Sequence, residues 1–187
     1  MLGTRTITNA TTLAMSPQTP ELDPIIRACR TSELPTLAEL ARHIWQQHYP
    51  AIISQAQIDY MLQQRYHPAA LQTELDTPQH WLDGLWLGET MLGFANYFCT
   101  AQPAEMKLDK LYLHPHWHGR GLGSLLLEYV TARARQHGCD TLTLAVNKHN
   151  TTAIKAYRRN GFEVAEQVVV DIGNGFVMDD FIMSKAL

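Results

Sequence analysis

The feature that most constrains this chain is a run of three glycines at alternate positions, Gly119, Gly121 and Gly123. An alternating segment that ends at Leu113 precedes the run, and Pro115 then removes a backbone donor, so we expect a strand to end there. Apolar side chains follow at helical spacing, namely Leu122, Leu125, Leu126, Tyr129 and Val130. The chain is therefore predicted to pass from a strand through a glycine loop directly into a helix.

A strand, a glycine loop and a helix N-terminus in this order are typical of an anion-binding site. Glycines let backbone N–H groups approach the anion, and the helix dipole adds partial positive charge. Arg120 adds a full charge. The lysine and hydroxyl pair of a Walker loop is missing, and Ser124 stands where a dinucleotide fingerprint needs a third glycine. A tight turn without a ligand is the alternative interpretation.

A second patterned segment follows. Leu142, Leu144 and Val146 alternate as in a strand. Asn150 is then suited to cap a helix, because its side chain can accept a backbone N–H of the first turn. The inner face of that helix would carry Ala153, Ile154 and Tyr157.

Together the two segments resemble the GNAT acetyltransferases. The pyrophosphate loop of that superfamily reads Arg or Gln, two residues, Gly, one residue, Gly or Ala. Here the fixed positions are His118, Gly121 and Gly123, of which His118 departs from the usual residue. A later segment of the superfamily reads Asn, two residues, Ala, three residues, Tyr, three residues, Gly-Phe. Its positions are filled by Asn150, Ala153, Tyr157, Gly161 and Phe162.

The resemblance implies an α/β GNAT fold over residues 25–187, with a central mixed and splayed sheet of about seven strands flanked by about four helices. Expected strands cover residues 25–29, 81–87, 91–99, 105–113, 142–146, 162–172 and 176–186. Ser32 is expected to cap the first helix, and Ser54 and Gln57 are expected to form a capping box at the start of the second. A short helical piece is expected over residues 69–75. Residues 1–24, rich in threonine and proline, are expected to form a loose N-terminal extension.

Composition indicates a single globular domain. Of 187 residues, 45% are hydrophobic and 18% are charged, and the net charge is −3. The absence of a block of basic residues argues against nucleic-acid binding. No apolar run approaches the ~20 residues that a membrane-spanning helix needs. Three widely spaced cysteines favour a reducing, cytoplasmic location. The sequence is compatible with a homodimer.

The resemblance implies acetyl-CoA as the cofactor. Its pyrophosphate would lie on residues 119–124, and its pantetheine would follow Leu111, Tyr112 and Leu113 where two strands splay apart. A main-chain N–H at Leu113 is the expected donor to the thioester oxygen. The expected cofactor-binding residues are Leu111, Tyr112, Leu113, His118, Gly119, Arg120, Gly121, Leu122, Gly123, Ser124, Asn150, Ala153 and Tyr157.

Tyr157 is the candidate general acid for the departing thiolate, and its position in the motif favours this role over that of a core aromatic. Taking ~10 for the pKa of tyrosine and ~8.5 for a thiol, the transfer is uphill by roughly 2 kcal/mol. Asp109 and Glu105 are candidate bases for the amine, directly or through water. Each could equally be a solvated strand residue.

Three further groups have alternative interpretations. His114, His116 and His118 alternate as zinc ligands can, but no thiol lies beside them and Pro115 makes the segment a loop, so no metal is expected. An acceptor pocket or simply the core could be formed by Trp45, Tyr49, Tyr60 and Tyr66. A cationic amine could be attracted, or an edge strand kept soluble, by Asp171, Asp179 and Asp180.

The C-terminal segment also resembles the PaiA group of polyamine acetyltransferases. The similar stretches are Phe176-Val177-Met178, Asp179-Asp180 and Ile182-Met183-Ser184-Lys185-Ala186-Leu187. The sequence therefore predicts an N-acetyltransferase that moves an acetyl group from acetyl-CoA to an amine, with a small-molecule or polyamine-like acceptor favoured. The alternatives are a protein N-terminal or lysine acetyltransferase, and a catalytically inactive CoA-binding module.

Overall fold

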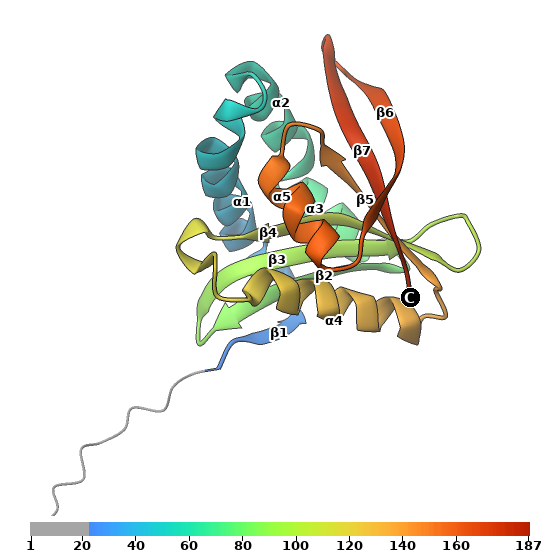
Figure 1. Cartoon of the computed structure of the whole chain (residues 1–187). Helices are drawn as coiled ribbons and strands as arrows, with labels where there is room; N and C mark the ends of the chain where they lie inside the picture. The colour runs from blue at the N-terminus through green and yellow to red at the C-terminus, as the bar shows by residue number, and fades with distance from the viewer. Residues whose placement is uncertain (1–22) are drawn as a thin grey trace, which may run out of the picture.

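A computed structural model describes residues 23–187 (Figure 1). Seven strands form one mixed sheet in the order β1-β2-β3-β4-β5-β7-β6. The strands are β1 (Ile25–Ala28), β2 (His80–Leu87), β3 (Thr90–Cys99), β4 (Glu105–Leu113), β5 (Thr141–Asn147), β6 (Glu163–Gly173) and β7 (Phe176–Ala186). The α-helices are α1 (Leu34–His48), α2 (Gln55–Arg65), α3 (Pro68–Asp76), α4 (Leu122–Gln136) and α5 (Thr151–Arg159). The predicted α/β architecture is confirmed, with a fifth helix because α3 is fully formed.

The predicted extension over residues 1–24 lies outside the described residues, except for its last two. The sheet separates two apolar cores. One core packs against α4 and α5, and its buried centre includes Leu108, Leu126 and Met183. The other packs against α1, α2 and α3 around residues such as Leu37 and Phe94. The two faces of the sheet therefore carry different helices. A site that involves both groups of helices requires an opening between strands of the sheet.

The start of α1 corrects the prediction that Ser32 caps it. A 3-10 turn, η1 (Thr31–Glu33), precedes the helix. The Glu33 carboxylate accepts hydrogen bonds from the Arg27 guanidinium at 2.7 and 2.9 Å and from the Arg30 N–H at 2.9 Å. These bonds lower the pKa of Glu33 to about 2, with Arg27 as the main cause. Because Glu33 organises this turn, the α-helix begins only at Leu34.

Helix α2 is joined to the last hairpin of the sheet. Ser54 caps it as predicted, since its hydroxyl accepts the Gln57 N–H at 3.2 Å. The Gln57 side chain does not complete a capping box, because its amide donates to the Val177 carbonyl of β7 at 2.7 Å. The Tyr60 hydroxyl donates to the Ile172 carbonyl of β6, also at 2.7 Å. The β6–β7 hairpin is thereby held against α2.

A β-bulge interrupts β4. Asn96 of β3 lies opposite Lys110, and the next residue Tyr97 lies opposite Leu108, so Asp109 is an extra residue in β4. Such a bulge bends the strand that contains it. Parallel pairing with β5 covers only Glu105–Leu108, whereas β5 pairs with β7 as far as Asn147. Figure 1 shows β6 and β7 rising steeply from the first strands of the sheet. A gap between β4 and β5 therefore opens at Asp109.

Candidate active site

The edge of β4 that faces the gap carries unpaired backbone groups. The His114 N–H donates to the Leu92 carbonyl of β3 at 2.8 Å. In an antiparallel pair the bonded residues alternate, so the N–H groups of Leu113 and Leu111 point away from β3 and into the gap. No described strand pairs with this part of β4 on that side. A bound ligand could therefore pair with it as a strand would.

The glycine loop follows the end of β4. Gly119 and Gly121 have φ of +74° and +78°, a region that favours glycine, and Gly121 is the N-cap of α4. At Gly119, Gly121 and Gly123 a Cβ would meet no described atom within 4 Å. The surface above the loop is therefore open, and the N–H groups at the start of α4 have room for an anion.

His118 and Arg120 stabilise this loop from its two sides. The His118 Nε2 lies 2.9 Å from the Leu113 carbonyl oxygen and donates to it, since a carbonyl can only accept. The Arg120 guanidinium lies over the Trp117 ring, 4.7 Å from its centroid. The His118 side chain, which replaces the usual Arg or Gln of the superfamily, thus holds the loop against the end of β4. Arg120 places a positive charge beside the loop.

The start of α5 forms the other border of the gap. The Asn150 side-chain oxygen, Oδ1, accepts the Ala153 N–H at 3.2 Å, which confirms the predicted cap. The same oxygen lies 3.2 Å from the His48 Nε2 at the end of α1. His48 was not among the predicted site residues, because its partner is 102 positions away in the sequence. The link fixes α5 relative to the helices on the opposite face of the sheet.

Tyr157 lies half-buried on α5. Its ring packs in the α4–α5 core, 5.8 Å from the Phe162 ring. Burial raises its pKa to about 12. Its hydroxyl makes no hydrogen bond within residues 23–187, so it is available to a ligand.

Tyr49 lies on the other side of the gap, in the 3-10 turn η2 (Tyr49–Ala51). Its ring stacks on Trp45, and its hydroxyl lies 3.5 Å from that of Tyr112. Burial raises the pKa of Tyr49, and Tyr112, Tyr157 and Asp180 raise it further. Tyr49 and Tyr157 belong to opposite cores, and the contact of the adjacent His48 with Asn150 joins the two helical layers here.

Asp109 lies at the bulge in a network of ion pairs. Its carboxylate accepts from the Arg65 guanidinium of α2 at 2.5 Å and from the Lys110 ammonium at 2.9 Å. Lys110 is fully buried and also pairs with Glu74 of α3 at 2.6 Å. Burial acts to raise the pKa of Asp109, but the two cations outweigh it and lower the pKa to about 2. A carboxylate this acidic is a weak base, so the geometry gives no support to the base role predicted for Asp109.

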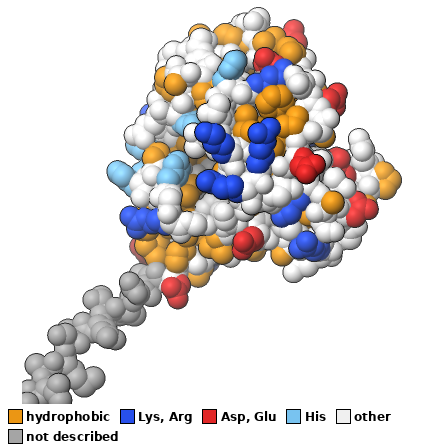
Figure 2. All heavy atoms as spheres, in the orientation of Figure 1, with side chains coloured by type: hydrophobic (Ala, Val, Ile, Leu, Met, Phe, Trp, Pro, Cys, Tyr) orange, Lys and Arg blue, Asp and Glu red, His pale blue; other side chains and the backbone are white. Residues whose placement is uncertain are grey.

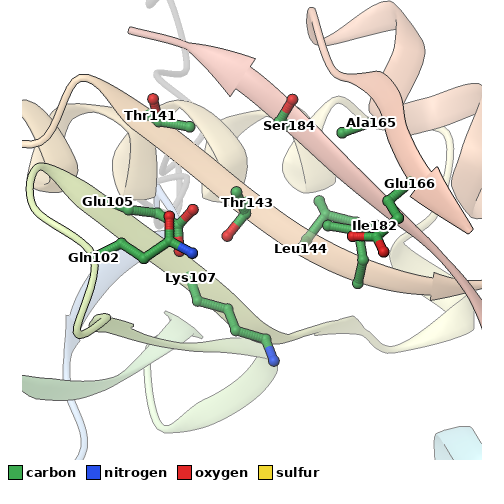
Figure 3. Close-up of a pocket in the computed structure, with 10 residues that line it drawn as sticks. All are labelled: Gln102, Glu105, Lys107, Thr141, Thr143, Leu144, Ala165, Glu166, Ile182 and Ser184. Atoms are coloured by element: carbon green, nitrogen blue, oxygen red, sulfur yellow. The ribbon is translucent and has the colours of Figure 1, made fainter. Parts of the chain in front are cut away.

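Glu105 lies at the opposite end of β4 from the glycine loop. It accepts a hydrogen bond from the Thr100 hydroxyl at 2.9 Å. It lines an open cavity of about 430 Å³ together with Lys107 of β4 and Glu166 of β6 (Figure 3). Asp109, where the gap begins, is four positions further along the strand, which corresponds to about 13 Å of extended chain. The geometry therefore gives no support to direct base catalysis by Glu105 at the gap.

Two of the alternating histidines, His114 and His116, stack on each other, and His43 of α1 stacks on His114. The rings of His43 and His114 lie 4.9 Å apart, and those of His114 and His116 lie 5.0 Å apart. In the described part of the chain, no group of three or more His, Cys, Asp or Glu side chains has a geometry that could hold a metal ion. These rings form the outer wall of the segment that joins β4 to the glycine loop.

The face drawn in Figure 2 carries a group of basic side chains near its centre, where α5 lies in Figure 1. Helix α5 contributes the exposed residues Lys155, Arg158 and Arg159. The chain as a whole has a net charge of −3, so this positive surface is local. It favours the approach of an anionic ligand toward the side of the sheet on which α4 and α5 lie.

An open strand edge that leads into a glycine loop at a helix N-terminus defines a protein that binds an extended ligand with an anionic group at one end. Residues 37–162 match the model of the Acetyltransferase (GNAT) family. The chain belongs to this family of acetyl-CoA-dependent N-acetyltransferases, and the predicted family, fold, cofactor and enzyme class are confirmed.

Two relatives and one solved structure illustrate the similarity. A spermidine N(1)-acetyltransferase from Thermoplasma acidophilum is 30% identical over 158 residues, which are 82% of this chain and 94% of the relative. A mycothiol acetyltransferase from Corynebacterium glutamicum is 36% identical over 86 residues, 46% of this chain and 29% of the relative. The crystal structure of PaiA N-acetyltransferase from Thermoplasma acidophilum in complex with coenzyme A has a TM-score of 0.75 and 26% identity, covering 88% of this chain and 99% of that one.

Within residues 23–187, no helix combines the length and the apolar character needed to cross a membrane.

We expect the ion pairs at the bulge to stabilise the folded state. Asp109→Asn should lower the free energy of unfolding by about 2–3 kcal/mol at pH 7, because two cations lose a shared anion. The folded-state pKa of Asp109, about 2, lies below the ~3.9 of an unfolded chain, so the contribution is present above pH ~4 and is lost as the pH falls toward 2. Urea denaturation at several pH values measures it.

The matched control is Glu39→Gln, which removes the carboxylate of an exposed pair with Arg42 on α1. This change should leave the unfolding midpoint unaltered. Equal midpoints for Asp109→Asn and the wild type would show that the network does not stabilise the bulge.

Proposed function

We propose that this enzyme acetylates a primary amine of a polyamine-like small molecule. The observation that carries the acceptor class is the similarity to a spermidine N(1)-acetyltransferase over 94% of that protein's length. A cavity of about 350 Å³ between α2 and the β6–β7 hairpin is large enough for part of such a chain. It is lined by Tyr60, Met61, Gln64, Arg65, Ile172 and Met178.

The cofactor is proposed to lie along β4. The pyrophosphate of acetyl-CoA would bind the N–H groups of residues 119–124, and the pantetheine would run beside Leu111, Tyr112 and Leu113. The N–H groups of Leu111 and Leu113 face the gap, and either can donate to the thioester oxygen. Leu113 is the predicted donor, and Leu111 offers the same group one pleat further from the loop. Asn150 and Ala153 would border the cofactor on the α5 side.

Tyr157 is proposed as the general acid that protonates the departing thiolate. Its pKa of about 12 keeps the hydroxyl protonated at neutral pH. Relative to a thiol pKa of ~8.5, the proton transfer is uphill by about 5 kcal/mol, more than an ordinary tyrosine would require. Hydrogen bonds from the site to the developing tyrosinate would have to lower this cost. The unpaired hydroxyl and the position of Tyr157 beside the gap support the assignment.

The location and the assembly are also proposals. All three cysteines, Cys29, Cys99 and Cys139, are free thiols, which supports a reducing compartment such as the cytoplasm. The homodimer stays a prediction. The interface of such a dimer would be formed by β6, because this strand is one edge of the sheet.

The acceptor class is tested by a screen that reads free coenzyme A thiol and identifies products by mass spectrometry. We expect kcat/KM for spermidine and related polyamines to exceed that for peptide N-termini and lysine peptides by at least about tenfold. Preference for peptides would indicate a protein acetyltransferase. Binding of acetyl-CoA without acetylation of any amine would indicate an inactive coenzyme-binding module.

The acid role is tested by Tyr157→Phe, which keeps the ring and removes the hydroxyl. We expect the single-turnover rate to fall by about 10²–10⁴, the usual value of general acid catalysis, with acetyl-CoA affinity within about threefold of wild type. Tyr129→Phe on α4, in the same core but not among the proposed site residues, should keep the wild-type rate. A wild-type rate for Tyr157→Phe would mean that the proton comes from another donor.

A further inference from the structure

Asp180 of β7 projects from the same face of the sheet as α1, α2 and α3. Residues of β7 alternate between the two cores: Phe181 and Met183 pack on the α4–α5 side, whereas Met178 packs on the α1–α3 side. By this alternation Asp180 faces the same way as Met178. The face it occupies is the one on which α2 meets the β6–β7 hairpin.

The Asp180 carboxylate is buried without a full set of partners. The residue is 6% exposed, and its Oδ1 has no hydrogen-bond partner within residues 23–187. A buried carboxylate that lacks a donor is costly and rare in folded proteins. The energetic cost of an unpaired acceptor is removed when a ligand brings a donor to it. Asp180 is therefore a candidate acceptor for a cationic ligand group.

Asp180 lies one strand beyond the gap between β4 and β5. It pairs in register with Asn147, three residues beyond Leu144, where β5 has already parted from β4. His48, next to Tyr49 of η2, lies 3.2 Å from the Asn150 side chain at the start of α5, and both Asp180 and Tyr157 act to raise the pKa of the Tyr49 hydroxyl. The carboxylate and the proposed acid therefore approach the same part of the gap from β7 and from α5.

The charges around Asp180 leave its carboxylate available. Lys148, after β5, is paired with Asp179, and Lys107 projects from β4. These lysines act to lower the pKa of Asp180, but burial and the neighbouring Asp179 outweigh them and raise it to about 6. Asp180 is thus a much stronger base than Asp109, and it is still largely ionised at pH 7.

We propose that Asp180 is a catalytic residue that binds the ammonium group of the acceptor amine and removes its proton. This inference rests on the proposed function and deepens it by assigning the base. The ammonium gives one proton to the Asp180 carboxylate, and the neutral nitrogen forms a bond to the thioester carbonyl carbon. When the carbon–sulfur bond breaks, the sulfur takes the Tyr157 proton and Tyr157 recovers one from the amide nitrogen. Asp180 then releases its proton to water.

Asp180→Asn tests this assignment, with Asp179→Asn as the matched control on the adjacent residue. For Asp180→Asn we expect kcat/KM for spermidine to fall at least about 100-fold, acetyl-CoA affinity to stay within about twofold, and the acidic limb of the pH profile near pH 6 to disappear. Its melting temperature should stay equal or rise, because an unpaired buried charge is removed. Asp179→Asn should keep the activity and retain an acidic limb, shifted to lower pH because a neighbouring negative charge that raises the pKa of Asp180 is removed.

A purely structural role would instead lower the melting temperature of Asp180→Asn and leave the pH profile unchanged. If wild type acetylates amines and Asp180→Asn does so at the same rate, the assignment of the base is wrong while the proposed function stands. If wild type acetylates no amine although acetyl-CoA binds, the proposed function fails, and the assignment of Asp180 fails with it.

Discussion

The bulge at Asp109 determines where β4 and β5 part and the sheet opens. It inserts one residue into β4, and pairing with β5 stops at the residue before it. The backbone groups that β5 would have bonded are left facing the gap. Had β4 continued in register with β5, these N–H groups would be paired within the sheet, and the edge proposed to bind the cofactor would not exist.

The bulge also brings charged side chains together that the fold must neutralise. Asp109 and Lys110 contact each other at 2.9 Å, and each takes a further partner, Arg65 of α2 and Glu74 of α3. These bonds attach two helices to the strand at the point where the sheet opens. Gln57 and Tyr60 attach α2 to the hairpin on the other side. Helix α2 is therefore tied both to β4 on one side of the gap and to the β6–β7 hairpin on the other.

Local features could be predicted from the sequence, and long-range features could not. The glycine loop, the Asn150 and Ser54 caps and the alternation of Leu111, Tyr112 and Leu113 depend on neighbouring residues, and each was found where the pattern indicated. The pairing of Asp109 depends on Arg65, which is 44 positions away. The burial of Asp180 depends on the register of β5 with β7. Ser32 was wrongly expected to cap a helix because Glu33 competes for the same turn through Arg27.

The two faces of the sheet have separate proposed roles, with the cofactor entering from the side of α4 and α5 and the amine from the side of α2. Both roles depend on the pairing of acetyl-CoA with the open edge of β4. A crystal structure of the protein with bound coenzyme A tests this pairing. We expect hydrogen bonds from the pantetheine to the main chain of Leu111 and Leu113, with the pyrophosphate on the N–H groups of residues 119–124. Coenzyme A bound elsewhere, with the edge of β4 unoccupied, would contradict it.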